Sequence, residues 1–186
     1  TGMGQKSRDN SCALCLLTSC FLAATISGCR APCDDEFEAV CGTRTYYVDA
    51  QRGDDGNPGT SRERPWQSIA QVNRMDFAPG DAILFAGGQT FSGTLRLQRE
   101  DSGTQERPVR IGSFGDGRAT IDSGTAGGLQ LIGCAYVTVS ELTFVGCGRK
   151  NGNDGNGVEL DRTEHVTLDS LDVSGFRLSG VAVLGG

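Results

Sequence analysis

The sequence has 186 residues, of which 28 are glycine and only 6% are aromatic, and its formal net charge is −6. The length fits one domain, and this composition suits many short strands joined by tight turns. The chain has no basic stripe, which is the usual electrostatic signature of a nucleic-acid binder, so we expect no nucleic-acid partner. The single histidine, His165, excludes sites that need several histidines.

Residues 1–28 have the layout of an export signal. Two basic residues precede an apolar segment over 12–26, which is too short for a comfortable transmembrane helix. The segment runs into ISGC at Cys29 and there resembles the lipobox of bacterial lipoproteins. That resemblance implies cleavage before Cys29, acylation of its thiol and a lipid-anchored protein of the bacterial cell envelope, with the membrane as a partner. The alternative is ordinary signal cleavage near Ala31 and an extracellular protein.

Cysteine usage agrees with export. After removal of the signal and acylation of Cys29, an even number of cysteines is left, which suits an oxidising compartment. These are Cys33, Cys41, Cys134 and Cys147. Their pairing stays open, because sequence alone does not fix it. Residues 29–44 carry an acidic run and are interpreted as a tether.

The folded domain is expected over 45–186 and opens with a β-rich run, TYYVD. A turn segment, GDDGNPGT, follows at 53–60. An amphipathic capping helix is predicted over 65–75, because apolar residues recur there every three positions after a proline. Those apolar residues are Trp66, Ile69, Val72 and Met75. Strands separated by turns are predicted at 82–87, 94–98, 108–114 and 119–123.

Three stretches, led by Gly128, Gly157 and Gly180, can be laid over one another. The step from Gly157 to Gly180 is 23 residues, and the earlier step is 29 because RKNGNDG is inserted at 149–155. Self-similarity at such a period indicates a solenoid, in which stacked coils bury one continuous core. The coinciding apolar pairs are Leu129/Val158, Leu131/Leu160, Val137/Val166, Val139/Leu168, Leu142/Leu171 and Phe144/Val173.

The segments 46–73 and 79–93, together with the repeats from Gly128, resemble the right-handed parallel β-helix of the pectin-lyase-like superfamily. The resemblance implies an all-β solenoid with a short N-terminal capping helix. It further implies an exported protein that binds and degrades an acidic polysaccharide, by lyase-type β-elimination or by glycoside hydrolysis. A non-enzymatic adhesin, a carbohydrate-binding solenoid and a polymer-level uronate epimerase stay open as alternatives. Since the sequence stops part-way through a coil, we expect the N-terminal part of a longer protein, with its main catalytic residues downstream of Gly186.

Equivalent outward side chains of stacked coils lie about 4.8 Å apart and form columns that can follow a polymer. One expected column holds Gln130, Glu159 and Ala182, and its neighbour holds Ile132, Asp161 and Leu184. Glu159 and Asp161 are the catalytic candidates, because a hydrolase needs two carboxylates and a lyase needs a base. The alternative for both residues is a solvated strand face.

The basic pair of the insertion, Arg149 and Lys150, joins Gln130 as the candidate substrate-binding set. Arg96 and Arg110 are expected to point outward and, if stacked, to contact an anionic sugar chain. His165 aligns with Tyr136 of the preceding repeat, and we expect the two rings to stack.

Asp54, Asp55 and Asn57 are the candidate metal ligands, and calcium is the one cofactor that the superfamily resemblance implies. Their spacing loosely matches an oxygen-rich calcium loop but lacks the glutamate that an EF-hand requires. The alternative is turn chemistry, in which Asp and Asn side chains bond their own backbone. The loop over 151–156 has the same two interpretations.

Overall fold

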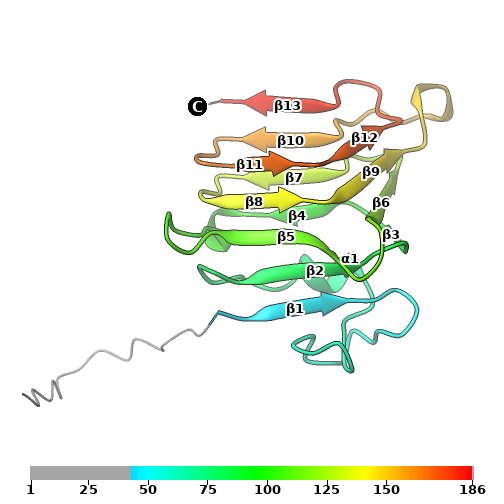
Figure 1. Ribbon diagram of the computed structural model, residues 1–186. Coiled ribbons are helices and arrows are strands. Elements are labelled where there is room, and N and C mark those ends of the chain that lie inside the picture. The colour runs from blue at the N-terminus through cyan, green and yellow to red at the C-terminus, as the bar shows by residue number, and fades with distance from the viewer. Residues whose placement is uncertain (1–42, 186) are drawn as a thin grey trace, which may run out of the picture. The chain divides into compact units, whose positions relative to one another are not determined.

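The structure is a computed structural model that describes residues 43–185, and the predicted parallel β-helix is confirmed in it. Every strand pair is parallel, and the coils stack in one direction along the solenoid (Figure 1). The expected signal, the lipidation site Cys29 and the cysteines at 33 and 41 lie outside the described residues. Among the residues described, no helix is both long and apolar enough to cross a membrane.

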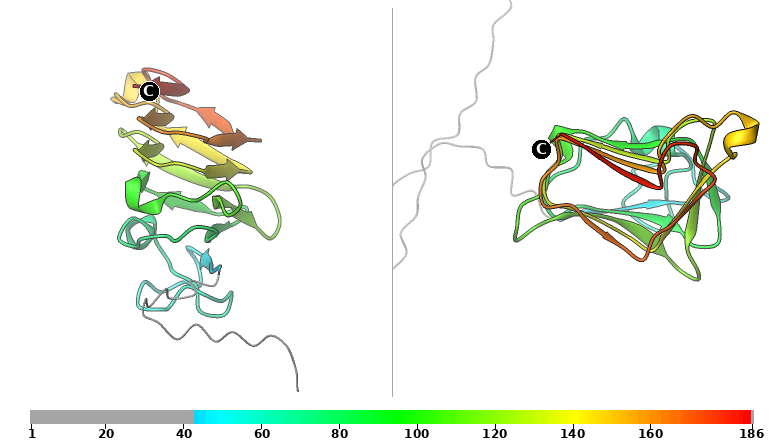
Figure 2. Two further views of the ribbon diagram at one scale, coloured as in Figure 1. Left: turned by 90° about the vertical axis from the view of Figure 1, so that its left-hand side faces the viewer. Right: turned by 90° about the horizontal axis from the view of Figure 1, so that it is seen from above.

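Each coil contributes one strand to each of three sheets. The first sheet contains β1 (Thr45–Val48), β2 (Ala82–Ala86), β5 (Val109–Phe114), β8 (Val137–Ser140) and β11 (Thr167–Asp169). The second sheet contains β3 (Thr90–Ser92), β6 (Ala119–Gly124), β9 (Leu142–Gly146) and β12 (Asp172–Ser174). The third sheet contains β4 (Leu95–Leu97), β7 (Leu129–Ile132), β10 (Val158–Asp161) and β13 (Val181–Leu184). Seen along the solenoid, successive coils lie over one another (Figure 2).

The repeat register predicted from the sequence is the register of the sheets. Val158 pairs with Leu129 on one side and with Val181 on the other. Side chains alternate across each strand, so the apolar positions point into the space enclosed by the three sheets. Leu131 is fully buried and its neighbour Leu160 is 9% exposed. Stacking therefore turns a pattern of single apolar residues into one continuous core.

The capping helix exists but is shorter than the predicted 65–75. Helix α1 spans Ile69–Val72, and Ser68 caps it by accepting a hydrogen bond from the backbone N–H of Gln71. The preceding Trp66 stays extended, because its backbone bridges to Val48 at the edge of β1. The predicted apolar face is nevertheless correct, since Trp66, Ile69 and Val72 are buried. The helix therefore begins at Ile69, because the backbone of Trp66 pairs with the edge of the first sheet.

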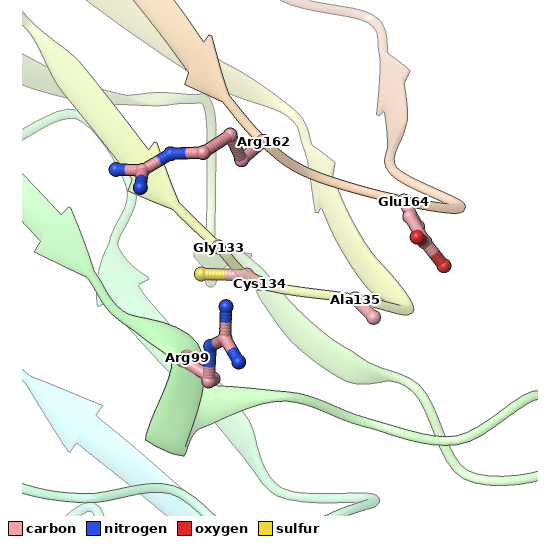
Figure 3. A pocket seen from close by; sticks show the side chains of 6 residues that line it. All are labelled: Arg99, Gly133, Cys134, Ala135, Arg162 and Glu164. Carbon is pink, nitrogen blue, oxygen red and sulfur yellow. The ribbon is translucent and has the colours of Figure 1, made fainter. Parts of the chain in front are cut away.

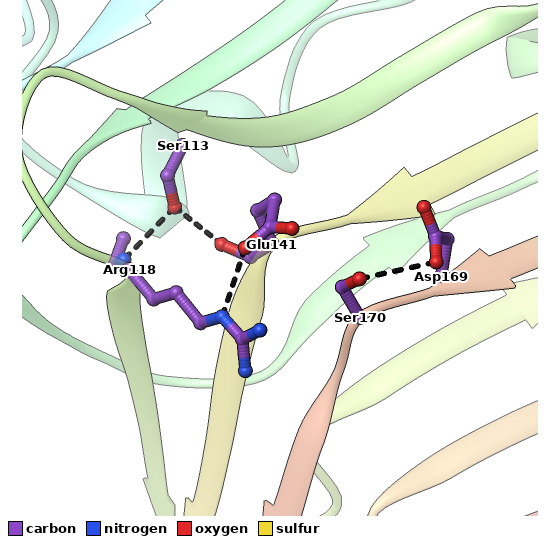
Figure 4. A network of polar contacts seen from close by, with 6 residues as sticks. Ser113, Arg118, Glu141, Asp169 and Ser170 are labelled. Carbon is purple, nitrogen blue, oxygen red and sulfur yellow. Dashed lines mark hydrogen bonds and ion pairs between the residues drawn. The ribbon is translucent and has the colours of Figure 1, made fainter.

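The corner between the first and second sheets is tight. Glu141 alone joins β8 to β9, and it adopts the left-handed conformation with φ of 53°. Ser170 occupies the equivalent place in the next coil with φ of 52°. The Ser113 hydroxyl donates to the Glu141 carbonyl, and the Arg118 guanidinium pairs with the Glu141 carboxylate at 2.9 Å (Figure 4). This corner is filled by its own side chains.

Candidate functional site

The outward face of the third sheet carries the column that the sequence predicted. Glu159 on β10 lies between Gln130 on β7 and Ala182 on β13, and Arg96 on β4 extends the column by one coil. The Arg96 Nε–H donates to Gln130 Oε1 at 2.9 Å. The Asn156 amide donates to Glu159 Oε2 at 3.0 Å. Fixed donors and acceptors are thus presented at the spacing of the coils.

The second predicted column also forms, with Asp161 between Ile132 and Leu184. Glu159 and Asp161 both point outward, because they alternate with the buried Val158. Two residues along a strand are separated by about 6.6 Å, which is compatible with paired carboxylates acting on one glycosidic bond. The Asp161 carboxylate is ion-paired with Arg162 at 2.9 Å.

The insertion after β9 projects from one end of the third sheet, as the end-on view shows (Figure 2). Arg149 and Lys150 lie in its short 3-10 helix η2 (Arg149–Asn151), and both are exposed. In the described part of the chain, neither forms a hydrogen bond or ion pair with Gln130 or Glu159.

A buried asparagine holds this insertion. The Asn153 amide donates to the carbonyls of Gly124 and Ala126, and its Oδ1 accepts from the N–H groups of Gly155 and Arg177. The side chain is 0% exposed. Asn153 thus ties three successive coils together.

A cavity of about 250 Å³ opens at the other end of the third sheet, where the chain turns toward the first sheet (Figure 3). It is lined by Arg99, Gly133, Cys134, Ala135, Arg162 and Glu164. Arg99 belongs to the 3-10 helix η1 (Arg99–Asp101), which follows β4. A shallower hollow lined in part by Gln98, Glu100 and Ile132 continues from it and shares Arg99, Gly133 and Arg162. The cavity therefore borders the column that contains Asp161.

Sequence reasoning missed this cavity, although the repeat alignment contained the signal for it. Extending the pairing of Leu97 with Leu131 by two residues brings Arg99 beside Gly133, and the next coil adds Arg162 at the same position. The alignment of the strands does not by itself show which turn residues lie over one another. The cavity arises where a glycine stands between two long side chains.

The thiol of Cys134 forms part of the cavity wall, and we expect it to be unreactive. It is buried, and it donates to the Gln98 carbonyl at 3.0 Å. Burial raises the pKa of this thiol to about 11. Cys134 and Cys147 both occur as free thiols, so they are not joined to each other.

The aspartates of the predicted calcium loop are engaged by backbone and side-chain donors. The Asp55 carboxylate accepts hydrogen bonds from the backbone N–H groups of Gln67 and Ser68 and from the Ser68 hydroxyl. Asp54 accepts from Gly56 N–H, and the Asn57 amide donates to the Pro65 carbonyl. Over residues 43–185, no group of three or more acidic, cysteine or histidine side chains is arranged to hold a metal. Calcium at this loop stays a prediction, which a calorimetric titration checks.

The predicted pairs of stacked side chains differ from each other. The rings of Tyr136 and His165 stack at 4.5 Å between centroids, as predicted. Arg96 and Arg110 do not stack on each other, because Arg96 lies on β4 in the third sheet and Arg110 on β5 in the first. The two arginines therefore cannot contact one sugar chain as neighbours in a column.

No protein-family model matches the chain. Its sequence is 32% identical over 135 residues to a lacto-N-biosidase of Bifidobacterium longum subsp. longum. This match covers 70% of this chain and 8% of the relative. It is also 34% identical over 95 residues to alpha-1,3-galactosidase A of Akkermansia muciniphila. This match covers 49% of this chain and 15% of the relative. The chain thus spans a small part of the curated relatives it matches.

Solved structures agree with the fold. The native GH136 lacto-N-biosidase of Eubacterium ramulus matches with a TM-score of 0.65 and 25% identity, over 76% of this chain and 30% of that one. A rhamnogalacturonan lyase matches with a TM-score of 0.52 and 15% identity, over 66% of this chain and 34% of that one. The second likeness concerns the fold alone. The chain is therefore a parallel β-helix related in sequence to glycoside hydrolases.

Proposed function

We propose that this β-helix belongs to a carbohydrate-active protein that binds a glycan along the outward face of β4, β7, β10 and β13 and cleaves it by hydrolysis. The observation that carries the proposal is the match over 135 residues to a relative that is itself a glycosidase. Hydrolysis is preferred to β-elimination because both curated relatives are glycosidases, whereas the lyase shares only the fold. An acidic polysaccharide as the substrate stays a prediction.

The proposed binding face has the chemistry that a sugar chain needs. Arg96, Gln130 and Glu159 present donors and acceptors in one column. Sugar hydroxyls both donate and accept hydrogen bonds, so a column of this mixed kind can bind successive residues of a glycan. The main catalytic residues are still expected downstream of Gly186, and among the described residues Glu159 and Asp161 are the candidate carboxylate pair. In such a pair one group protonates the leaving oxygen and the other activates water or attacks the anomeric carbon.

The test is an assay of the full-length protein on a panel of neutral and acidic glycans. Reducing ends and absorbance near 235 nm are followed together, since elimination leaves an unsaturated uronate and hydrolysis does not. We expect reducing ends without absorbance. Rising absorbance would show a lyase. No increase in either reducing ends or absorbance would favour the carbohydrate-binding solenoid.

Variants separate catalysis from binding on this face. Glu159→Gln and Asp161→Asn are expected to lower kcat by more than about tenfold if these groups transfer protons. Gln130→Ala is expected to raise KM and leave kcat unchanged. The control is Asp172→Asn, which removes an exposed carboxylate from β12 in the second sheet. Unchanged turnover in both carboxylate variants would exclude Glu159 and Asp161 as the catalytic pair.

We also propose export and lipid anchoring at Cys29, supported by the ISGC sequence alone. Cells that express the full gene are grown with a fatty-acid analogue that can be labelled. The protein is expected to carry the label, and Cys29→Ser is expected to lose it. Secretion of an unlabelled protein would favour the extracellular alternative.

A further inference from the structure

The cavity at the edge of the third sheet has a simple structural origin. Arg99, Gly133 and Arg162 occupy the same turn position in three successive coils, and the middle residue has no side chain. A Cβ added at Gly133 would lie 3.6 Å from both Cβ and Nε of Arg99. Gly133 also has a positive φ of 68°, which favours glycine. Two coils span about 9.6 Å at the usual strand spacing. The Arg99 side chain lies over Gly133, and a cavity of about 250 Å³ is left beside it.

The walls of this gap are held firmly by backbone hydrogen bonds between the coils. Gly133 N–H donates to the Asp161 carbonyl at 2.8 Å, and Glu164 N–H donates to the Cys134 carbonyl at 3.0 Å. Ala135 N–H donates to the Ser102 hydroxyl at 3.1 Å. A ligand would therefore enter a preformed cavity and would not have to order a loop, which lowers the entropic cost of binding.

The side chains at the cavity offer both kinds of hydrogen-bonding group. Within residues 43–185, the guanidinium of Arg99 and the carboxylate of Glu164 have no hydrogen-bond or ion-pair partner. Figure 3 shows the two groups on different sides of Cys134. A guanidinium only donates hydrogen bonds, and a carboxylate only accepts them. A ligand that satisfies both must accept and donate, as neighbouring sugar hydroxyls do.

The local charges disfavour an anionic ligand. Arg162 is already neutralised by Asp161, and Arg99 is accompanied by Glu100 and Glu164 in the linings of the cavity and the adjoining hollow. A uronate or a sulfate ester would therefore meet two carboxylates for one available guanidinium. A neutral sugar ring meets no such repulsion.

We propose that this cavity is a subsite for one neutral pyranose residue, whose hydroxyls accept from Arg99 and donate to Glu164. The inference rests on the proposed function, because the cavity borders the column through which the glycan is proposed to run. It adds a specificity that the two columns alone do not supply. A side branch or a flanking residue of the glycan would enter here while the main chain follows the sheet.

The experiment measures the affinity of the full chain for two probes by isothermal calorimetry. One probe is a neutral galactose-containing tetrasaccharide, and the other is a galacturonate tetrasaccharide. The variant Arg99→Met removes the donor, and Glu164→Gln replaces the charged acceptor with a neutral amide that accepts more weakly. The matched controls Arg64→Met and Glu106→Gln change exposed residues elsewhere.

The expected result is binding of the neutral probe that each cavity variant weakens by about tenfold or more, because hydrogen bonds to charged groups are lost. The controls should stay within about twofold, as is usual for surface substitutions. The proposal is overturned if the full chain does not bind the neutral probe, or if both cavity variants bind it as well as the parent. Tighter binding of galacturonate, strengthened further by Glu164→Gln, would also overturn it and identify an anion site.

The same variants distinguish this proposal from the proposed hydrolysis. If Glu159→Gln abolishes cleavage while Arg99→Met and Glu164→Gln leave the affinity for the neutral probe unchanged, the proposed hydrolysis is supported and the proposed subsite is contradicted. If the two cavity variants lose affinity for the neutral probe but no glycan is cleaved, the proposed subsite is supported and the proposed hydrolysis is contradicted.

Discussion

The first and last coils among residues 43–185 are built from similar apolar patterns but differ in what packs against them within those residues. At the first coil, Trp66 stacks on Tyr46 with ring centroids 4.8 Å apart and is 1% exposed. At the last described coil, Val183 is 72% exposed, although Leu131 in the same column is fully buried. A coil is therefore stabilised by what lies on both of its sides, because one coil cannot enclose its own apolar residues.

The largest expected effect is at the covered first coil. Trp66→Ala should lower the free energy of unfolding by about 3–5 kcal/mol, because it removes a fully buried ring and leaves a cavity beside the ring of Tyr46. Urea denaturation measures this. Trp66→Phe is the matched control, which keeps a ring and loses the hydrogen bond from Nε1 to the Asn57 carbonyl. Equal losses in the two variants would show that the hydrogen bond, and not the ring, secures this coil.

The next effect concerns the insertion that links the middle coils. Asn153→Ala should cost about 2–3 kcal/mol, because four backbone groups lose their partner in a buried place. Asn151→Ala removes one hydrogen bond, from an exposed side chain to the Cys147 carbonyl, and should cost less than about 1 kcal/mol. If Asn153→Ala proved as mild as its control, the insertion would not be coupled to the stability of the coils.

One pair of valines tests the comparison with the chemistry held constant. Val158 and Val181 are neighbours in one column, yet their exposed fractions are 0% and 47%. For the 186-residue chain by itself, Val158→Ala should cost about 2 kcal/mol and Val181→Ala less than about 1 kcal/mol, since only the first change opens a cavity there. The two unfolding curves give the difference directly. Equal costs would mean that the last coil is as well packed as the middle one.

The smallest effect is electrostatic and again concerns the first coil. Burial raises the pKa of Asp55, but hydrogen bonds from the Ser68 hydroxyl and from the N–H groups of Gln67 and Ser68 outweigh it, so the net shift is downward. A lowered pKa means that the carboxylate stabilises the fold above its unfolded pKa, near pH 4, and that this contribution is lost as the pH falls through the folded pKa. The melting temperature of Asp55→Asn should therefore fall less on acidification to pH 3 than that of the parent. Parallel pH profiles of the two proteins would contradict this.

The sequence alone determined the fold and the outward columns. The periods of 23 and 29 residues and the alternation in Val158–Asp161 were sufficient, because stacking in register follows once each coil must bury its apolar face. The stacking of Tyr136 on His165 followed from the same alignment.

Only the tertiary structure decided the extent of the capping helix and the position of the cavity. Trp66 left the predicted helix because a backbone bridge to Val48 competed with the first helical turn. The cavity depends on Arg99, Gly133 and Arg162, which are distant in sequence and fall together only when three turns are stacked. Local propensity describes a strand or a turn by itself, whereas a site between coils is defined by which side chain is missing from a column.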